Sequence, residues 1–225
     1  MPRTQRLTPG GMVFHVLNRG VGRQKIFASH RDYEAYDKAV AETLQLYPIR
    51  VLAYCLMPNH WHFILWPKED GQLSAFLQRL TNTHTQRWQR AKQRVGYGHL
   101  YQGRFKSFPI QADDHFYTVA RYVERNALRA GLVERAEDWR WGSLARRSLT
   151  AAEPLLSEWP QPRPRNWRQL VNRPETEAEL SALRRSVQRG SPFGGETWAV
   201  RTAAELCLGS TLRPRGRPQM ERDEN

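Results

Sequence analysis

Runs of β-forming residues alternate along the chain with stretches whose apolar side chains recur every three or four positions. A short β-rich run bounded by turn signals is typical of a strand, and the three- to four-residue repeat is typical of a helix with one buried face. These patterns predict strands at 12–17, 49–57, 60–66 and 104–110, and helices at 31–47, 73–88 and 113–129.

Short signals at the ends of these elements define how they connect. Pro58-Asn59 is a turn dipeptide that makes the second and third strands neighbours. Pro109 places the fourth strand at a sheet edge or lies near the end of that strand, and Gly131 ends the third helix. The order strand, helix, strand, strand, helix, strand, helix is the ferredoxin-like (RRM-like) arrangement with one extra helix. We therefore expect an α+β fold, an antiparallel sheet with helices packed on it.

The character of the sequence changes beyond Trp141. We expect one domain at residues 1–145 and a basic, mainly helical extension at 146–225. The extension contains a Pro-rich linker at 158–167, helical patterns at 175–188 and 195–208, and the basic segment RPRGRP at 213–218.

Composition narrows the class of protein. The chain has 225 residues, of which 40% are hydrophobic and 11% aromatic, enough to bury a core. The longest apolar run, 51–57, is far below the ~20 residues of a membrane span, and no secretory leader is visible. Two cysteines, Cys55 and Cys207, cannot form a disulfide framework. We expect a cytoplasmic protein with no membrane partner.

The net charge points to a polyanionic partner. It is +13, and the sequence pI is near 10.4. Residues 1–145 carry +9 of this charge and residues 146–225 carry +4, so the first domain is itself basic. A chain that ends after about Ser143 is therefore expected to keep the activity of the first domain, provided that the extension does not cover exposed core.

Two histidines lie two residues apart at the start of the third predicted strand. Because side chains alternate across a strand, His60 and His62 point to the same face and can hold a divalent metal ion together. A polar pair on the surface of the sheet is the alternative interpretation.

The third predicted helix carries a row of polar side chains. Tyr122, Asn126 and Arg129 are spaced by four and three residues, so they share a face beside the buried stripe. A tyrosine at the core edge and an asparagine turned to solvent would give the same pattern. Tyr117 lies about 140° around the helix from Tyr122, and Tyr101 is expected in a loop.

The strand with His-hydrophobic-His, together with a helix that carries tyrosine and an amide four residues later, resembles the HUH single-tyrosine transposases. The chain is more closely similar to their bacterial REP-associated tyrosine transposase branch. One departure is Ala127, where that family usually has proline. The matching segments are FHVLNRGVGRQKIF at 14–27, AYCLMPNHWHFIL at 53–65, GHLYQGRFKS at 98–107 and RYVERNALRAGLV at 121–133.

The resemblance implies a metal-dependent DNA strand transferase that acts on single-stranded or hairpin repeats. His60 and His62 would bind Mg²⁺ or Mn²⁺ with Asn126 as the third protein ligand. Tyr122 would attack a phosphodiester and keep it as a 5′-phosphotyrosine. The sequence does not identify a base for the phenol proton.

Cations interleaved with glycines or aromatic residues are typical of nucleic-acid contacts. Arg19 and Arg23 lie in NRGVGRQ, Arg104 and Lys106 lie in YQGRFKS beside two aromatic residues, and Arg129 lies on the tyrosine helix. We expect these five to contact DNA and the RPRGRP segment to enter a minor groove. A solvated basic face with core aromatic residues is the alternative for these clusters, and a disordered basic tail is the alternative for RPRGRP. The expected state is a nucleoid-associated monomer, with a dimer as the other possibility.

Two other functions stay open at this point. One is a nuclease with the same metal site but no covalent intermediate, and the other is a non-catalytic binder that uses the ferredoxin-like sheet. The predicted strands lack the aromatic pattern of RNA-binding sheets, which counts against the binder. A protein–DNA adduct that survives denaturant would separate the transferase from the nuclease.

Overall fold

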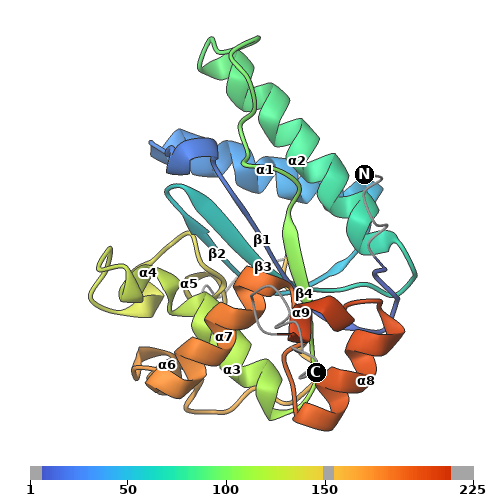
Figure 1. Cartoon of the computed structure of the whole chain (residues 1–225). Helices are drawn as coiled ribbons and strands as arrows, with labels where there is room; N and C mark the ends of the chain where they lie inside the picture. Colours follow the sequence, from blue (N-terminus) through green and yellow to red (C-terminus); the bar gives the residue numbers. More distant parts are fainter. Residues whose placement is uncertain (1–6, 149–154, 214–225) are drawn as a thin grey trace, which may run out of the picture.

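The computed structural model describes residues 7–148 and 155–213 (Figure 1). The RPRGRP segment predicted to enter a minor groove therefore lies outside the described residues, apart from Arg213. Within the described part of the chain, none of the helices combines the length and apolarity needed to cross a bilayer.

A four-stranded antiparallel sheet lies at the centre of the molecule, with strand order β2-β3-β1-β4 (Figure 1). This arrangement confirms the predicted α+β, ferredoxin-like class. Strand β4 is at an edge, as Pro109 indicated, and it begins later than predicted because its pairing with β1 ends at Lys106. The strands are β1 (Val13–Arg19), β2 (Arg50–Met57), β3 (His60–Trp66) and β4 (Lys106–Ile110).

Two long helices, α1 (His30–Leu46) and α2 (Gln72–Ala91), cover one face of the sheet (Figure 1). The apolar side chains of β3 alternate toward these helices, and Trp61, Phe63 and Leu65 are at most 1% exposed. The other face of β3, which carries the two histidines, is therefore left for the third predicted helix to cover.

That helix is α3 (Asp114–Glu124), and it continues through Arg125 into the short α4 (Asn126–Arg129). It packs on the second face of the sheet, against β2, β3 and β4. Gly131 ends it in the left-handed conformation, with φ of +67°, as predicted. Glycine adopts this conformation without the strain that a side chain would cause.

The extension packs against α3 (Figure 1). Its residues Trp167, Val171 and Leu183 are at most 4% exposed, in the same apolar cluster as the buried side of α3. A truncation after Ser143 would uncover this cluster. The expectation that such a truncated chain stays active required that the extension cover no core, and this requirement is not met. The remaining elements are η1 (Val21–Arg23), η2 (Ala136–Asp138), α5 (Ser143–Arg146), α6 (Trp167–Asn172), α7 (Glu177–Arg189), α8 (Glu196–Glu205) and α9 (Gly209–Leu212).

A buried carboxyl group fastens the extension to α3. Glu124 Oε1 accepts a hydrogen bond from Ser143 Oγ at 2.5 Å, and its Oε2 accepts one from Trp167 Nε1 at 2.6 Å. Burial raises the pKa of Glu124, while these two donors and the charge of Arg147 oppose the rise. Because a buried polar group without partners is costly, the two hydrogen bonds hold α5 and α6 against α3.

The substitution Trp167→Phe should lower the free energy of unfolding by about 1–3 kcal/mol, since it leaves Glu124 without one donor. Equilibrium denaturation measures the loss. Trp88→Phe is the matched control, because Trp88 Nε1 has no hydrogen-bond partner among the described residues. Equal losses in the two variants would contradict a stabilising role for the Glu124 contact.

Candidate active site

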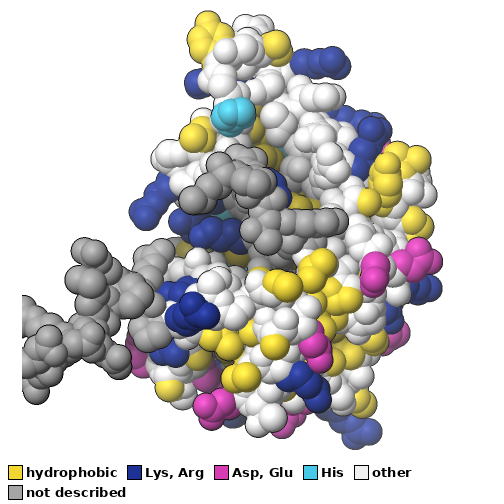
Figure 2. Space-filling view, turned by 45° about the vertical axis from the view of Figure 1, so that its right-hand side comes forward, with side chains coloured by type: hydrophobic (Ala, Val, Ile, Leu, Met, Phe, Trp, Pro, Cys, Tyr) yellow, Lys and Arg dark blue, Asp and Glu magenta, His cyan; other side chains and the backbone are white. Residues whose placement is uncertain are grey.

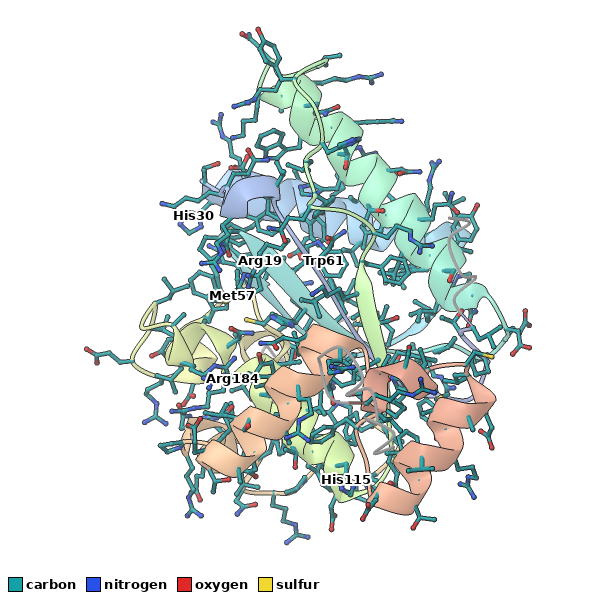
Figure 3. All side chains as sticks on the ribbon, viewed as in Figure 1. Arg19, His30, Met57, Trp61, His115 and Arg184 are labelled. Carbon is teal, nitrogen blue, oxygen red and sulfur yellow. The ribbon has the colours of Figure 1, made fainter. Side chains whose placement is uncertain are left out.

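The two histidines at the start of β3 lie on the sheet face that α3 covers. The rings of His60 and His62 are 5.0 Å apart and edge to face, and His62 is 3% exposed. His60 pairs with Arg19 of β1 and Met57 of β2, and Figure 3 shows these two neighbours at the same end of the sheet. Both rings therefore lie on the same face of the sheet, as the alternation of side chains along a strand predicts.

Asn59 determines which nitrogen of His60 carries the proton. Its Nδ2 donates to the Arg23 carbonyl at 3.3 Å, so its Oδ1 is turned to His60 and accepts from Nδ1 at 2.6 Å. The proton therefore lies on Nδ1, and the lone pair of Nε2 is available. A hydrogen-bonded Nδ1–H is the usual second contact of a metal-binding imidazole.

A third histidine, His15 of β1, lies within hydrogen-bond distance of His62. The distance between His15 Nε2 and His62 Nδ1 is 2.9 Å, and the two rings stack with centroids 5.0 Å apart. In the tautomer in which His62 donates from Nδ1 to His15, His62 Nε2 is free for a ligand. Sequence reasoning missed His15, although a histidine at an inward-facing position of the apolar strand VFHVLNR was a visible signal.

The three imidazoles are kept neutral by their surroundings. Burial lowers the pKa of His15 to about 3 and that of His60 to about 4, and it holds the pKa of His62 well below the ordinary value. The charges of Arg19 and Arg129 lower the pKa values of His60 and His62 further. A neutral imidazole keeps the lone pair that a metal ion requires.

Tyr122 lies on α3 with its ring against these histidines. The ring centroid is 6.0 Å from that of His62 and 6.4 Å from that of His15, in both cases edge to face. The guanidinium carbon of Arg129, seven residues later, lies 4.0 Å from the centroid of the Tyr122 ring. The structure thus brings a phenol, three imidazoles and a cation together.

Asn126 begins α4, one helical turn beyond Tyr122, and is 6% exposed. Helix α4 packs on β2, where Cys55 pairs with His62. The amide Nδ2 of Asn126 has no hydrogen-bond partner among the described residues. A half-turn about the Cβ–Cγ bond of Asn126 would put the amide oxygen where Nδ2 lies, and a cation could bind the oxygen there.

These residues fit a divalent metal ion with open coordination positions. Two imidazoles and one amide oxygen are neutral ligands, and such a set leaves room for substrate oxygens. In the part of the chain that the structure describes, no group of three or more His, Cys, Asp or Glu side chains is placed to hold a metal ion. A metal site at the two histidines would therefore be completed by ligands of another kind, such as the amide oxygen of Asn126.

The competing tyrosines are engaged elsewhere. Tyr117 Oη donates to the Pro162 carbonyl at 2.6 Å, on the side of α3 that meets the extension. Tyr101 Oη lies 3.0 Å from Trp61 Nε1 and 2.6 Å from His84 Nδ1, in the core under α1 and α2. Each phenol is thus held away from the histidine pair.

The cations predicted to bind DNA lie in two groups. Arg19 and Arg23 are next to the start of β3, and the Arg23 backbone has φ of +60°, in the left-handed region. Arg104 and Lys106 are exposed near the start of β4, and Arg104 lines an open groove of about 2030 Å³ between α2 and the loop at 99–105. Figure 2 shows most acidic side chains in its lower half, whereas Lys and Arg also occupy the upper half.

Two predicted details of this surface differ in the structure. Tyr101 and Phe105, the two aromatic residues near Arg104 and Lys106, are 7% and 9% exposed and belong to the core, as the alternative interpretation had it. Arg129 is turned inward, with Nη1 3.0 Å from Glu175 Oε1 of the extension. Periodicity could not reveal either feature, since both depend on contacts with distant parts of the chain.

Comparison with known proteins gives the site a family context. The family model described as "Transposase IS200 like" matches residues 10–126. A Haemophilus influenzae protein described as a REP-associated tyrosine transposase is 24% identical over 148 residues, which cover 62% of this chain and 82% of that protein. A solved structure of a REP-associated tyrosine transposase bound to a REP hairpin superposes with a TM-score of 0.54 at 20% identity, over 70% of this chain and 92% of that one.

Buried neutral histidines predict an acid-sensitive fold. In the folded chain the pKa values of His15, His60 and His84 are lowered to between about 3 and about 4. Below pH 6.5, the ordinary pKa of histidine, the unfolded chain therefore binds more protons than the folded chain. The free energy of unfolding should therefore fall as the pH falls from about 6.5 toward 4. Denaturation in the presence of chelator at pH values across this range measures the slope.

The variant His84→Phe removes one of these groups without touching the site, so its stability should depend less on pH than that of the wild type. A free energy of unfolding that stays constant across this range would contradict the burial of uncharged imidazoles.

Proposed function

Because the chain belongs to the IS200-like transposase family, we propose that it cleaves and rejoins single-stranded or hairpin DNA, with Tyr122 as the nucleophile. The observation that carries the proposal is the position of Tyr122, whose ring lies against the cation of Arg129 and against the rings of His62 and His15. The likeness to a transposase bound to a REP hairpin supports hairpin DNA as the substrate class.

The proposed reaction conserves one phosphodiester bond at each step. The Tyr122 oxygen forms a bond to the phosphorus, the P–O3′ bond breaks, and its electron pair leaves with the 3′ oxygen, which takes a proton to become a hydroxyl group. The phenol gives up its own proton as it attacks. Attack of another 3′ hydroxyl on the 5′-phosphotyrosine then joins a new strand and restores the phenol.

The metal ion belongs to the same proposal. His60 and His62, each through Nε2, and the amide oxygen of Asn126 would hold Mg²⁺ or Mn²⁺, which withdraws charge from the phosphodiester when bound. The protein prepares these ligands beforehand. Asn59 fixes the proton of His60 on Nδ1, which leaves the Nε2 lone pair available. In the proposal His62 donates from Nδ1 to His15, so that its own Nε2 lone pair is available too.

The DNA would reach the site along the cationic surface beside it. Arg19 and Arg23 flank the start of β3, and Arg104 and Lys106 follow the loop that borders the open groove. We assign these four side chains to phosphate contacts, which hold a strand without reading its sequence.

The variant Tyr122→Phe should bind DNA with unchanged affinity but form no covalent adduct, because it lacks only the attacking oxygen. The measurement is a denaturing gel of the full chain incubated with Mn²⁺ and labelled single-stranded DNA from the flanks of its own gene. Tyr117→Phe, on the same helix but bonded to Pro162, is the matched control and should form the adduct. Undiminished adduct in Tyr122→Phe would reject the assignment, and cleavage with no adduct in the wild type would favour the nuclease.

The metal assignment makes a separate prediction that does not depend on activity. Ala at His60 or His62 should abolish Mn²⁺ binding measured by calorimetry, and Asn126→Ala should weaken it. His15→Phe should weaken binding by about 10- to 100-fold, since His62 loses its orienting partner. His84→Phe, a buried histidine bonded to Tyr101 in the other core, should bind as the wild type does. Mn²⁺ binding that survives the loss of both sheet histidines would refute the assignment.

A further inference from the structure

One acidic residue of the extension reaches the tyrosine helix. Glu175 precedes α7, and its side chain is only 2% exposed. Its Oε1 lies 3.0 Å from Arg129 Nη1, and its Oε2 lies 3.2 Å from Arg125 Nε. Both cations belong to the helix that carries Tyr122, formed by α3 and its continuation α4. In sequence they precede Glu175 by 50 and 46 residues.

The two arginines are not equivalent. Arg125 Nη1 also donates to the backbone carbonyls of Val171 and Asn172, at 3.1 Å and 2.7 Å, so it anchors the extension whatever happens at Glu175. The other contacts of Arg129 are to Tyr122. Its guanidinium carbon lies 4.0 Å from the ring centroid, and its Nη1 lies 3.4 Å from the Tyr122 carbonyl oxygen.

The guanidinium plane of Arg129 therefore has one side on the tyrosine ring and one nitrogen on the carboxylate. A flat cation over an aromatic face restrains the ring, and the carboxylate restrains the cation. Without Glu175, only the contacts with the Tyr122 ring and the Tyr122 carbonyl oxygen would hold the guanidinium group of Arg129 in this position, in competition with solvent and with phosphate groups.

We propose that Glu175 is a positioning residue for the nucleophile. It holds Arg129 over the ring of Tyr122 and so fixes the direction in which the phenol oxygen faces the histidine pair. The inference rests on the proposed function, because it gives Tyr122 the role of nucleophile. It makes part of the extension, outside the segment matched by the family model, a component of the active site.

A matched pair of variants separates positioning from anchoring. Glu179, four residues after Glu175, forms an ion pair with Arg121 at 2.6 Å, between α7 and the tyrosine helix, but the cation over the Tyr122 ring is Arg129 and not Arg121. Glu179→Gln and Glu175→Gln each remove one charge from the same interface. Glutamine is also accepted at the capping position of Glu179 in α7, so that helix is expected to keep its start.

The first measurement is the ring signal of Tyr122 in the full chain with ¹³C-labelled tyrosine, assigned by its absence in Tyr122→Phe. Glu175→Gln should shift the Tyr122 signal, whereas Glu179→Gln should leave it in place. This result does not require metal, DNA or turnover. An unchanged Tyr122 signal in folded Glu175→Gln would overturn the proposal.

The second measurement is the single-turnover rate of adduct formation with Mn²⁺ and the labelled single-stranded DNA used for Tyr122→Phe. Glu175→Gln should slow the step by about 10- to 100-fold with DNA affinity unchanged, because a misdirected nucleophile reacts slowly. Glu179→Gln should stay within about twofold of the wild type. Equal rates in the two variants would reduce Glu175 to an anchor and contradict the proposal.

A third variant guards against loss of the fold. Arg129→Lys keeps the positive charge and can still pair with Glu175, but it loses the planar group that covers the ring. It should show the same shift of the Tyr122 signal and the same slow step as Glu175→Gln, with a melting temperature close to that of the wild type. A normal rate and signal in this variant would overturn the proposal. Absence of any adduct in the wild type would instead reject the proposed function and leave the spectroscopic answer standing.

Discussion

The rest of the site depends on one constraint: successive side chains of β3 point to opposite faces of the sheet, and α3 covers one of these faces. It directs Trp61, Phe63 and Leu65 into the core under α1 and α2 and leaves His60 and His62 for the other face. A shift of one residue in register would exchange these two sets. Because α3 then covers the histidine face, the imidazoles are desolvated, which keeps them neutral and able to act as ligands.

Helix α3 links this sheet face to the C-terminal extension. One side of it presents Tyr122 to the histidines, and Glu124 on the same helix receives donors from Ser143 and Trp167. The extension also supplies Glu175, the carboxylate partner of Arg129. The position of the phenol is thus determined by the sheet on one side and by the extension on the other. This dependence means that the extension and the first domain share one site.

Much of the fold could be predicted because its elements are marked locally. Apolar spacing and turn residues located the four strands, the first three helices and the two helical segments after residue 175. The alternation in PNHWHFIL also indicated that His60 and His62 share a face. The family resemblance contributed the roles of Tyr122 and Asn126, which spacing alone left undecided between a reactive row and an ordinary helix surface.

The missed features all depend on contacts between segments far apart in sequence. His15 of β1 contacts His62 of the neighbouring strand β3, 47 residues later in sequence, and Glu175 contacts Arg129, 46 residues earlier. Arg129 resembled a DNA-facing cation because nothing local shows that a carboxylate covers it. Tyr101 resembled a stacking residue because its sequence context is basic, whereas Trp61 and His84 hold its hydroxyl group in the core.

The central claim is that the phenol of Tyr122 becomes the covalent attachment point of DNA. Mass spectrometry of the trypsin-digested adduct tests this most directly, because cleavage after Arg121 and Arg125 releases the short peptide YVER with Tyr122 at its start. The account predicts that this peptide carries a nucleotide joined through a 5′ phosphate. A nucleotide on the peptide that contains Tyr117 or Tyr101, with YVER unmodified, would contradict it.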